Sequence, residues 1–342
     1  MQDYIQPKIT EQEGRSIWQA MLVDVNNLEL TKPSVLRALL KLAIFISLLG
    51  FLLMLSWSQN QIWVLSVVYV CIAFLLAQFA FVGHDAGHGT VSSVATVNHI
   101  IGQISMTIVT GLAYDEWIAR HRTHHRFCQH EASDPDMDVS LVISLTENSK
   151  TKKGTWGRRF TRYQSIHIWF LSLFFGHSQR LLSQAAVLAR PQRYPLDALV
   201  LTIHFGLWFG VPILILDTPF VLALIAYLVP LTILGPYLAA IFWVNHVGMP
   251  LIRNTDEFSF LEHQSVTSRT IINPPFTDLV FGGLNYQIEH HLFPQVPSYN
   301  LAAAQGLVQK HFNRNGIVYN GSSWWGAVRE IASHLRRIGV AQ

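Results

Sequence analysis

Long apolar stretches, separated by polar segments, dominate the pattern of this chain. Four of them are long enough for a helix that crosses a hydrocarbon core of about 30 Å, which takes roughly 20 residues. They lie at about 36–57, 62–82, 196–216 and 219–243. Because only 58–61 and 217–218 link the two members of each pair, the pattern predicts two helical hairpins.

Two weaker apolar stretches have a different character. The stretch at about 100–113 carries no charge but is too short to span, so we expect it to be buried or interfacial. The stretch at about 166–189 is interrupted by histidine, glutamine and arginine, which favours an amphipathic helix on a surface.

The positive charges give an orientation. No Lys or Arg occurs at 43–119 or at 194–252, so all 24 fall in three blocks. Two hairpins put these blocks on one side of the membrane, which the positive-inside rule makes the cytoplasmic side. We therefore expect an all-α integral membrane protein of one domain, 1–342. A polar segment, 1–35, precedes four transmembrane helices, and a helical cytoplasmic cap is formed by 83–195 and 244–342.

Composition excludes several other classes. Charged residues make up 13% of the chain, about half the share in soluble domains, and the net charge of +3 provides no field for nucleic acid. Two cysteines, Cys71 and Cys128, supply neither a disulfide framework nor a four-cysteine zinc site. The polar first 30 residues predict no cleavable signal peptide.

Histidines cluster where the predicted spans reach the cytoplasm. Spacings of three and four residues put side chains on one face of a helix, one turn apart, so each cluster can offer two or three imidazoles to a single point. The clustered residues are His84 and His88, then His121, His124 and His125, and finally His290 and His291. His246 stands alone after the fourth predicted span.

Eight imidazoles at one depth exceed what a tetrahedral zinc ion can bind. They suit two six-coordinate ions with open positions, and iron is among the metals that fit. The alternative for a solitary histidine is a helix cap or a solvated side chain. That reading applies to His99, His130, His167, His177, His204, His263, His311 and His334.

These motifs resemble those of the membrane-bound fatty acid desaturases, from about residue 80 to 300. The resemblance rests on HDAGH at 84–88, HRTHH at 121–125 and QIEHHLFP at 287–294. It includes DPD at 134–136 and GGLNY at 282–286. The third motif, with glutamine in its first place, is similar to that of front-end and related bacterial acyl desaturases.

The resemblance implies a di-iron site of two Fe²⁺ with O₂ as co-substrate. Its implied metal ligands are His84, His88, His121, His124, His125, His246, His290 and His291. Gln287 takes the place of a ninth histidine and could ligate, act through water or hold a neighbour. Asn245 and Asn285 are polar neighbours. The carboxylates expected to orient imidazoles are Asp85, Asp134, Asp136, Asp138, Asp278 and Glu289, and for 134–136 a simple turn is the alternative.

The resemblance also implies an O₂-dependent acyl desaturase, whose substrate is an acyl-lipid, acyl-CoA or acyl-carrier protein in a lipid bilayer. The cytochrome b5 domain with a His-Pro-Gly-Gly motif, often fused to front-end desaturases, does not occur here. We therefore expect a separate electron donor, a ferredoxin or cytochrome b5. The same absence favours a bacterial inner or thylakoid membrane over endoplasmic reticulum.

Three other functions compete with desaturation. A hydroxylase or ketolase of a lipid, alkane or carotenoid would use the same metal site. A metal transporter would place its ligands near the bilayer midplane, and a membrane cytochrome would pair histidines inside the spans. The predicted spans contain little beyond Gln78 and His204 for either purpose.

Overall fold

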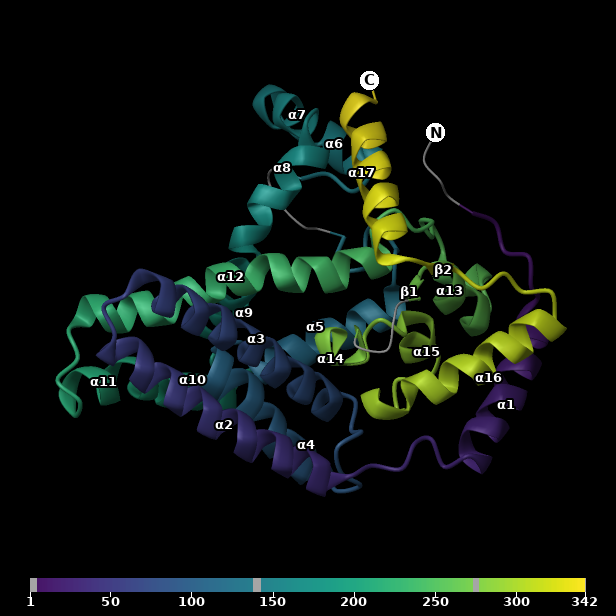
Figure 1. Cartoon of the computed structure of the whole chain (residues 1–342). Coiled ribbons are helices and arrows are strands. Elements are labelled where there is room, and N and C mark those ends of the chain that lie inside the picture. The colour runs from purple at the N-terminus through teal and green to yellow at the C-terminus, as the bar shows by residue number, and fades with distance from the viewer. Residues whose placement is uncertain (1–4, 138–142, 273–276, 342) are drawn as a thin grey trace. The chain divides into compact units, whose positions relative to one another are not determined.

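The computed structural model describes residues 5–137, 143–272 and 277–341, and within these it is almost entirely helical (Figure 1). The chain divides into two compact units. Unit 1 comprises 1–32, 120–170 and 240–342, and unit 2 comprises 33–119 and 171–239. Helices α5 (Tyr114–Phe127), α8 (Gln164–Leu171) and α12 (Phe220–His246) contribute residues to both units.

Four apolar helices are long enough to cross a membrane, as the sequence predicted. They are α2 (Val35–Ser58), α3 (Ile62–Gly87), the helix Pro195–Leu214 and α12. The third is composed of α10 (Pro195–Phe205), the π-helical turn η3 (Gly206–Gly210) and α11 (Val211–Leu214). The prediction of an all-α fold with four helices that are long and apolar enough to cross a membrane is confirmed.

Two of these helices continue beyond the predicted apolar stretches, and each ends two residues before a glycine in the left-handed conformation. Helix α3 runs to Gly87 and α12 to His246, so His84 and His246 occupy last turns of the helices instead of following them. Gly89 and Gly248 adopt φ of 72° and 86°, the left-handed conformation that commonly ends a helix. Backbone chemistry, and not the end of the apolar run, sets these boundaries.

The shorter helices of unit 2 pack on the apolar ones. They are α4 (Ala95–Gly102), the π-helix η1 (Gln103–Thr110), η2 (Ser172–Phe174) and α9 (Phe175–Ala189). Most of η1 is buried, as expected for the short uncharged stretch. A Cβ on Gly235 of α12 would lie 2.2 Å from the Ser172 carbonyl oxygen, so glycine permits this close helix contact. Segments 83–119 and 171–195, assigned to the cap from the sequence, thus belong to the unit of apolar helices.

Unit 1 is assembled from three separated segments of the chain around one apolar core. Its helix α1 (Glu11–Asn27) begins with a capping box between Thr10 and Glu13. Met21 and Val25 of α1 are fully buried against residues of the last third of the chain. The other elements are α6 (Glu147–Thr151), α7 (Thr155–Thr161), η4 (Thr255–Glu257), α13 (Phe260–Val266), β1 (Thr270–Ile271), α14 (Thr277–Phe281), α15 (Gln287–Leu292), η5 (Ser298–Asn300), α16 (Leu301–Arg314), β2 (Gly321–Ser322) and α17 (Trp324–Val340).

Candidate metal centre

Helix α5 carries the second histidine cluster. The buried Asp197 carboxylate starts this helix by accepting the backbone N–H groups of Asp115, at 3.2 Å, and Glu116, at 3.0 Å. An acceptor at these free N–H groups stabilises the first turn of a helix. The histidines follow two turns later on α5, and their rings lie in unit 1.

A first set of imidazoles is formed by His121, His125 and His290. The Nε2 atom of His125 lies 3.1 Å from Nε2 of His121 and 3.1 Å from Nε2 of His290. Two of these residues are one turn apart on α5, and the third comes from α15. The structure therefore brings the second and third histidine clusters together through the same ring atom.

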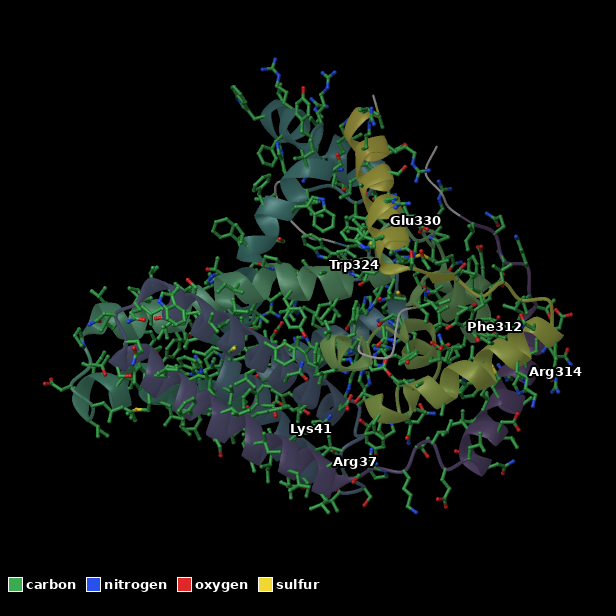
Figure 2. The ribbon with its side chains drawn as sticks, in the orientation of Figure 1. Arg37, Lys41, Phe312, Arg314, Trp324 and Glu330 are labelled. Atoms are coloured by element: carbon green, nitrogen blue, oxygen red, sulfur yellow. The ribbon has the colours of Figure 1, made fainter. Side chains whose placement is uncertain are left out.

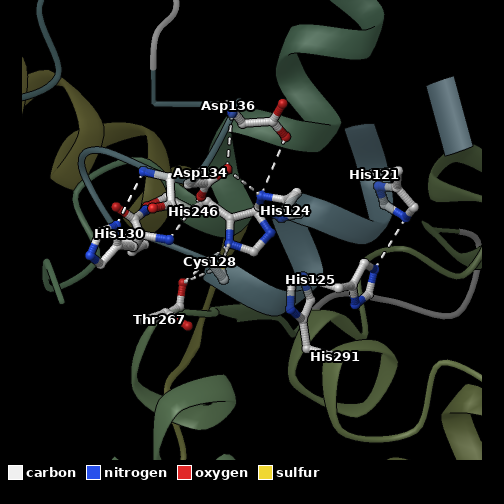
Figure 3. Close-up of polar contacts among 12 residues, drawn as sticks. His121, His124, His125, Cys128, His130, Asp134, Asp136, His246, Thr267 and His291 are labelled. Carbon is white, nitrogen blue, oxygen red and sulfur yellow. Dashed lines mark hydrogen bonds and ion pairs between the residues drawn. The ribbon is translucent and has the colours of Figure 1, made fainter. Parts of the chain in front are cut away.

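A second set is formed by His124, His246 and His291, whose rings lie 4.8 to 5.3 Å apart (Figure 3). In each ring the Nδ1 atom faces a protein oxygen. His124 meets Asp134 Oδ1 at 2.9 Å, and His246 meets the Thr267 carbonyl at 3.1 Å. His291 meets Gln264 Oε1 at 2.8 Å. These contacts favour a proton on Nδ1, so in the neutral form of each ring Nε2 is the acceptor.

Asp134 is the carboxylate that the sequence motif places beside the second cluster, and it is 4% exposed. It lies in a turn, as the alternative reading proposed, and still contacts His124. Burial opposes charge on His124, but the nearby Asp134 raises the pKa of His124 well above its usual value. Asp136 is 58% exposed with its carboxylate 3.5 Å from His124 Nδ1, so its contact is weaker.

His291 differs from His124 in that its neutral form is favoured. Burial and the neighbouring imidazoles hold the pKa of His291 well below its usual value. Neutral imidazole is the form that binds metal. The Nε2 atom of His291 is also buried without a hydrogen-bond partner among the described residues. A buried acceptor without a hydrogen-bond partner is the kind of atom that could bind a metal ion.

Gln287 contacts a ligand candidate and an asparagine. Its Nε2 atom lies 2.9 Å from Nε2 of His246, and its Oε1 accepts from Asn245 Nδ2 at 2.9 Å. Asn285 Nδ2 donates to Asp278 Oδ1 at 3.2 Å. The Oδ1 atoms of Asn245 and Asn285 are buried without partners among the described residues. Both oxygens could therefore accept a hydrogen bond from bound water, and whether Gln287 ligates stays a prediction.

Cys128 and Gln264 are neighbours of the second set that the sequence did not reveal. The Cys128 thiol is fully buried, with Sγ 3.4 Å from His246 Nδ1. Burial raises the pKa of the thiol, which favours its neutral form. Gln264 joins His291 to the backbone of α5 through the His125 carbonyl, at 3.0 Å. A signal for Cys128 exists, since it lies one helical turn after His124, but none distinguishes Gln264.

Glu289 bonds to neither histidine set and instead anchors α15, the helix that carries His290 and His291. It accepts from Tyr319 Oη at 2.7 Å and from Thr270 Oγ1 at 2.9 Å. Thr270 Oγ1 in turn accepts the backbone N–H of Ile288. Burial raises the pKa of Glu289 to about 7. Among the other predicted carboxylates, Asp278 contacts Asn285, and Asp138 lies outside the described residues.

The first cluster lies in unit 2, at the end of α3. The rings of His84 and His88 are 4.7 Å apart, and His84 Nδ1 is 3.7 Å from Asp85 Oδ1, too long for a hydrogen bond. The role of Asp85 in orienting this imidazole therefore has no support from the distance. Most solitary histidines bond to structural partners, for example His263 to the Cys128 carbonyl at 2.8 Å and His334 to the Leu145 carbonyl at 2.9 Å.

The six histidines of unit 1 fit iron by their chemistry. Nitrogens bound at right angles about 2.1 Å from one ion lie about 3 Å apart. The 3.1 Å separations within the first set match this spacing. The second set offers three Nε2 atoms of fixed tautomer, one of them orphaned. Residues His121, His125 and His290 could thus hold one ion, and His124, His246 and His291 another.

Arg269 holds the end of α12, where His246 lies. Its guanidinium donates to the Val244 carbonyl at 2.7 Å and pairs at 2.8 Å with Glu330, which is labelled on α17 in Figure 2. The Arg269 side chain is 3% exposed, whereas that of Glu330 is 56% exposed. The buried bond to the backbone should therefore contribute more to stability than the exposed end of the ion pair.

We expect Arg269→Met to lower the free energy of unfolding by about 2 kcal/mol, the value of a buried hydrogen bond from a charged donor. Glu330→Gln should cost less than about 1 kcal/mol, because exposed ion pairs contribute little. Thermal unfolding of the purified variants in detergent measures both. An equal loss in the two variants would assign the effect to the ion pair instead.

The chain is similar to known fatty acid desaturases. The fatty acid desaturase family model matches residues 58–323. The chain is 28% identical over 284 residues to a fatty acid desaturase 2-like protein of Mus musculus, covering 79% of this chain and 56% of that protein. It is 28% identical over 291 residues to a Delta(8)-fatty-acid desaturase of Arabidopsis thaliana, covering 78% and 62%. A Delta 8-(E)-sphingolipid desaturase of Kluyveromyces lactis is 25% identical over 321 residues, 89% of this chain and 55% of that protein.

The chain spans little more than half the length of these relatives. The family match, however, covers most of its residues and all three histidine motifs. The chain belongs to the fatty acid desaturase family.

Proposed function

We propose that this protein is an O₂-dependent desaturase that introduces a cis double bond into a lipid- or CoA-linked acyl chain. Two Fe²⁺ ions would be held by the eight clustered histidines. His84 and His88 are included on the family motif alone. Electrons would come from a separate donor, a ferredoxin or cytochrome b5.

The observation that carries this proposal is that all six histidines of unit 1 leave Nε2 as the ring nitrogen that could bind a metal ion. In the first set the Nε2 atoms meet one another, and in the second set Nδ1 is occupied by a protein oxygen. A chance group of basic side chains would have no reason to present the same atom six times. Membership of the desaturase family supports iron as the metal.

Such an iron pair, with O₂ and two electrons, supplies the oxidising power to remove hydrogen from adjacent methylenes, which no side chain can do. The protein positions the ligands. Asp134, Gln264 and the Thr267 carbonyl hold the second-set imidazoles by Nδ1, and such outer partners fix both ring orientation and ligand basicity. Buried Asn245 and Asn285 offer oxygens for bound water.

The substrate and the membrane setting are further parts of this proposal. The names of the relatives specify fatty acids in one case and sphingolipids in another, so the acyl carrier and the geometry of the double bond belong to the proposal. We propose a multi-pass protein with its metal site on the cytoplasmic side, from the distribution of Lys and Arg. The relatives described above are eukaryotic, which gives no support to the bacterial or thylakoid membrane expected from the sequence.

The test is gas chromatography–mass spectrometry of fatty acid methyl esters from a host poor in desaturases. The host would express the chain with a ferredoxin or cytochrome b5 system, beside a His291→Ala control. A new unsaturated acid, absent from the control, supports desaturation, and derivatives that fix bond position identify the product. A product that gains an oxygen atom would support the hydroxylase instead. No product from a chain that carries two irons and is supplied with both donors would contradict the proposal for acyl substrates.

A further inference from the structure

Arg180 of α9 is a buried cation whose N–H groups have no hydrogen-bond acceptor among the described residues. The residue is 6% exposed, and its guanidinium carbon lies 4.1 Å from the centre of the Tyr227 ring. None of its side-chain nitrogens donates a hydrogen bond to any described residue, and the enclosed Nε atom has no partner. Burial lowers the pKa of this guanidinium because it disfavours the positive charge, and no carboxylate among the described residues offsets this effect.

The groups around Arg180 are already bonded to one another. His204 contacts the Ile108 carbonyl at 2.7 Å and Tyr227 Oη at 2.8 Å. Trp208 donates to the Val109 carbonyl at 3.0 Å, and Gln184 donates to the Gly111 carbonyl at 2.8 Å. These contacts satisfy the backbone carbonyl groups at the end of the π-helix η1. Arg180 is the member of this cluster that remains without a hydrogen bond.

A comparison with Arg269 shows how a second buried arginine of this chain is satisfied. Both arginines are at least nine-tenths buried, but Arg269 has a carboxylate and a backbone carbonyl as acceptors. The Tyr227 ring lies under the guanidinium carbon of Arg180, and stacking of this kind leaves the N–H groups at the edge of the plane unsatisfied. A charged donor so deeply buried calls for an acceptor that is not part of the described protein.

The surroundings of Arg180 point to a lipid as the source of that acceptor. Helix α9 lies against two candidate spans. His177 of α9 bonds to Thr232 of α12 at 2.8 Å. Ser183 of α9 accepts from the backbone N–H of Ala113, and Ala113 packs in one core cluster with residues of α10. On its other face α9 exposes Leu181 and Leu182, each 61% exposed, and Leu188, 79% exposed. An apolar face of this kind is typical of a helix in contact with lipid.

We propose that Arg180 binds the oxyanion of a lipid, a phosphate or a carboxylate. A guanidinium edge matches two oxygens of either group. Because Nε is enclosed, the two Nη atoms are those that the ligand would reach. The site lies within unit 2 and uses none of the proposed metal ligands, so it is independent of the proposed catalysis.

The test measures lipid binding to the purified full chain in detergent. Radiolabelled oleate and dioleoylphosphatidylglycerol probe the carboxylate and the phosphate, and oleyl alcohol and dioleoylglycerol are their uncharged counterparts. We expect the anionic lipid that fits to bind at least ten times more tightly than its counterpart. Arg180→Met should abolish that preference, and Arg180→Lys should retain part of it. Arg190→Met, which removes an exposed charge at the end of the same helix, should bind as the unmodified chain does.

Unchanged anion preference in a folded Arg180→Met variant would overturn the proposal, and so would equal binding of charged and uncharged lipids by the unmodified chain. A lower unfolding temperature with unchanged lipid binding would make Arg180 a purely structural residue. If Arg180→Met does not fold, phenylglyoxal modification of the unmodified chain provides the test, with the modified peptide identified by mass spectrometry. Oleate or phosphatidylglycerol should then protect Arg180, and absence of protection by both would contradict the site.

Discussion

Replacing His124 with alanine is expected to reduce the iron content from the proposed two per chain to one or fewer and to lower product formation by more than about 100-fold. Loss of only an outer partner of a metal ligand typically costs 10- to 100-fold, so loss of the ligand should exceed that range. The reason lies in the second set, where His124 is the imidazole held by a buried carboxylate. Without its Nε2 atom, two imidazoles remain in this set.

Metal analysis by mass spectrometry and the fatty acid assay measure the two effects. His130→Ala is the matched control, because His130 lies in the same segment and bonds to the Arg253 carbonyl at 2.8 Å and not to either set. The control should retain both irons and most of the activity. Full iron content in folded His124→Ala would remove this residue from the ligand set.

Asp134→Asn is expected to lower activity by about 10- to 100-fold, the usual cost of losing an outer partner. Asp134 uses both oxygens: Oδ1 faces His124 and accepts from the backbone N–H of Asp136 at 2.9 Å, and Oδ2 accepts from that of Gln129 at 2.8 Å. Asparagine has one acceptor oxygen in place of two. An NH₂ group would therefore face either the imidazole or a backbone N–H.

Asp136→Asn separates this effect from a general loss of negative charge. The Asp136 side chain is largely exposed, and its carboxylate is farther from His124, so we expect its activity to fall less than about threefold. Iron affinity, measured by competition with a chelator, should follow the same order. Equal losses in the two variants would mean that charge near His124 matters and the hydrogen bond does not.

The four apolar helices and the grouping of most candidate ligands could be predicted from the sequence, for physical reasons. A membrane helix needs about 20 apolar residues in a row, a pattern that no other element requires. Histidines one turn apart necessarily share a helix face, and that geometry is local. His121 and His125 therefore needed no tertiary information to be paired, whereas their approach to His290 depends on the fold.

The outer partners could not be read from the sequence because they depend on contacts between distant segments. Gln264 lies on α13 and reaches His291 of α15, and Thr267 offers a backbone carbonyl, which every residue possesses. Glu289 adjoins two ligand candidates but faces Tyr319 and Thr270. Proximity in sequence is thus a poor guide to which carboxylate contacts an imidazole, since adjacent positions on a helix point in different directions.

The assembly of unit 1 from three separated segments has a consequence for biosynthesis. Met21 and Val25 of α1 share their core with Leu30 and with residues from Leu261 to Phe312. During vectorial synthesis the apolar face of the first helix therefore lacks most of this core until Leu261 and the residues after it have been translated. Both histidine sets also need α15, so a ribosome stalled before residue 287 should carry a chain that retains none of the metal held by the complete protein. Iron insertion in this protein is accordingly expected to be a late, essentially post-translational event.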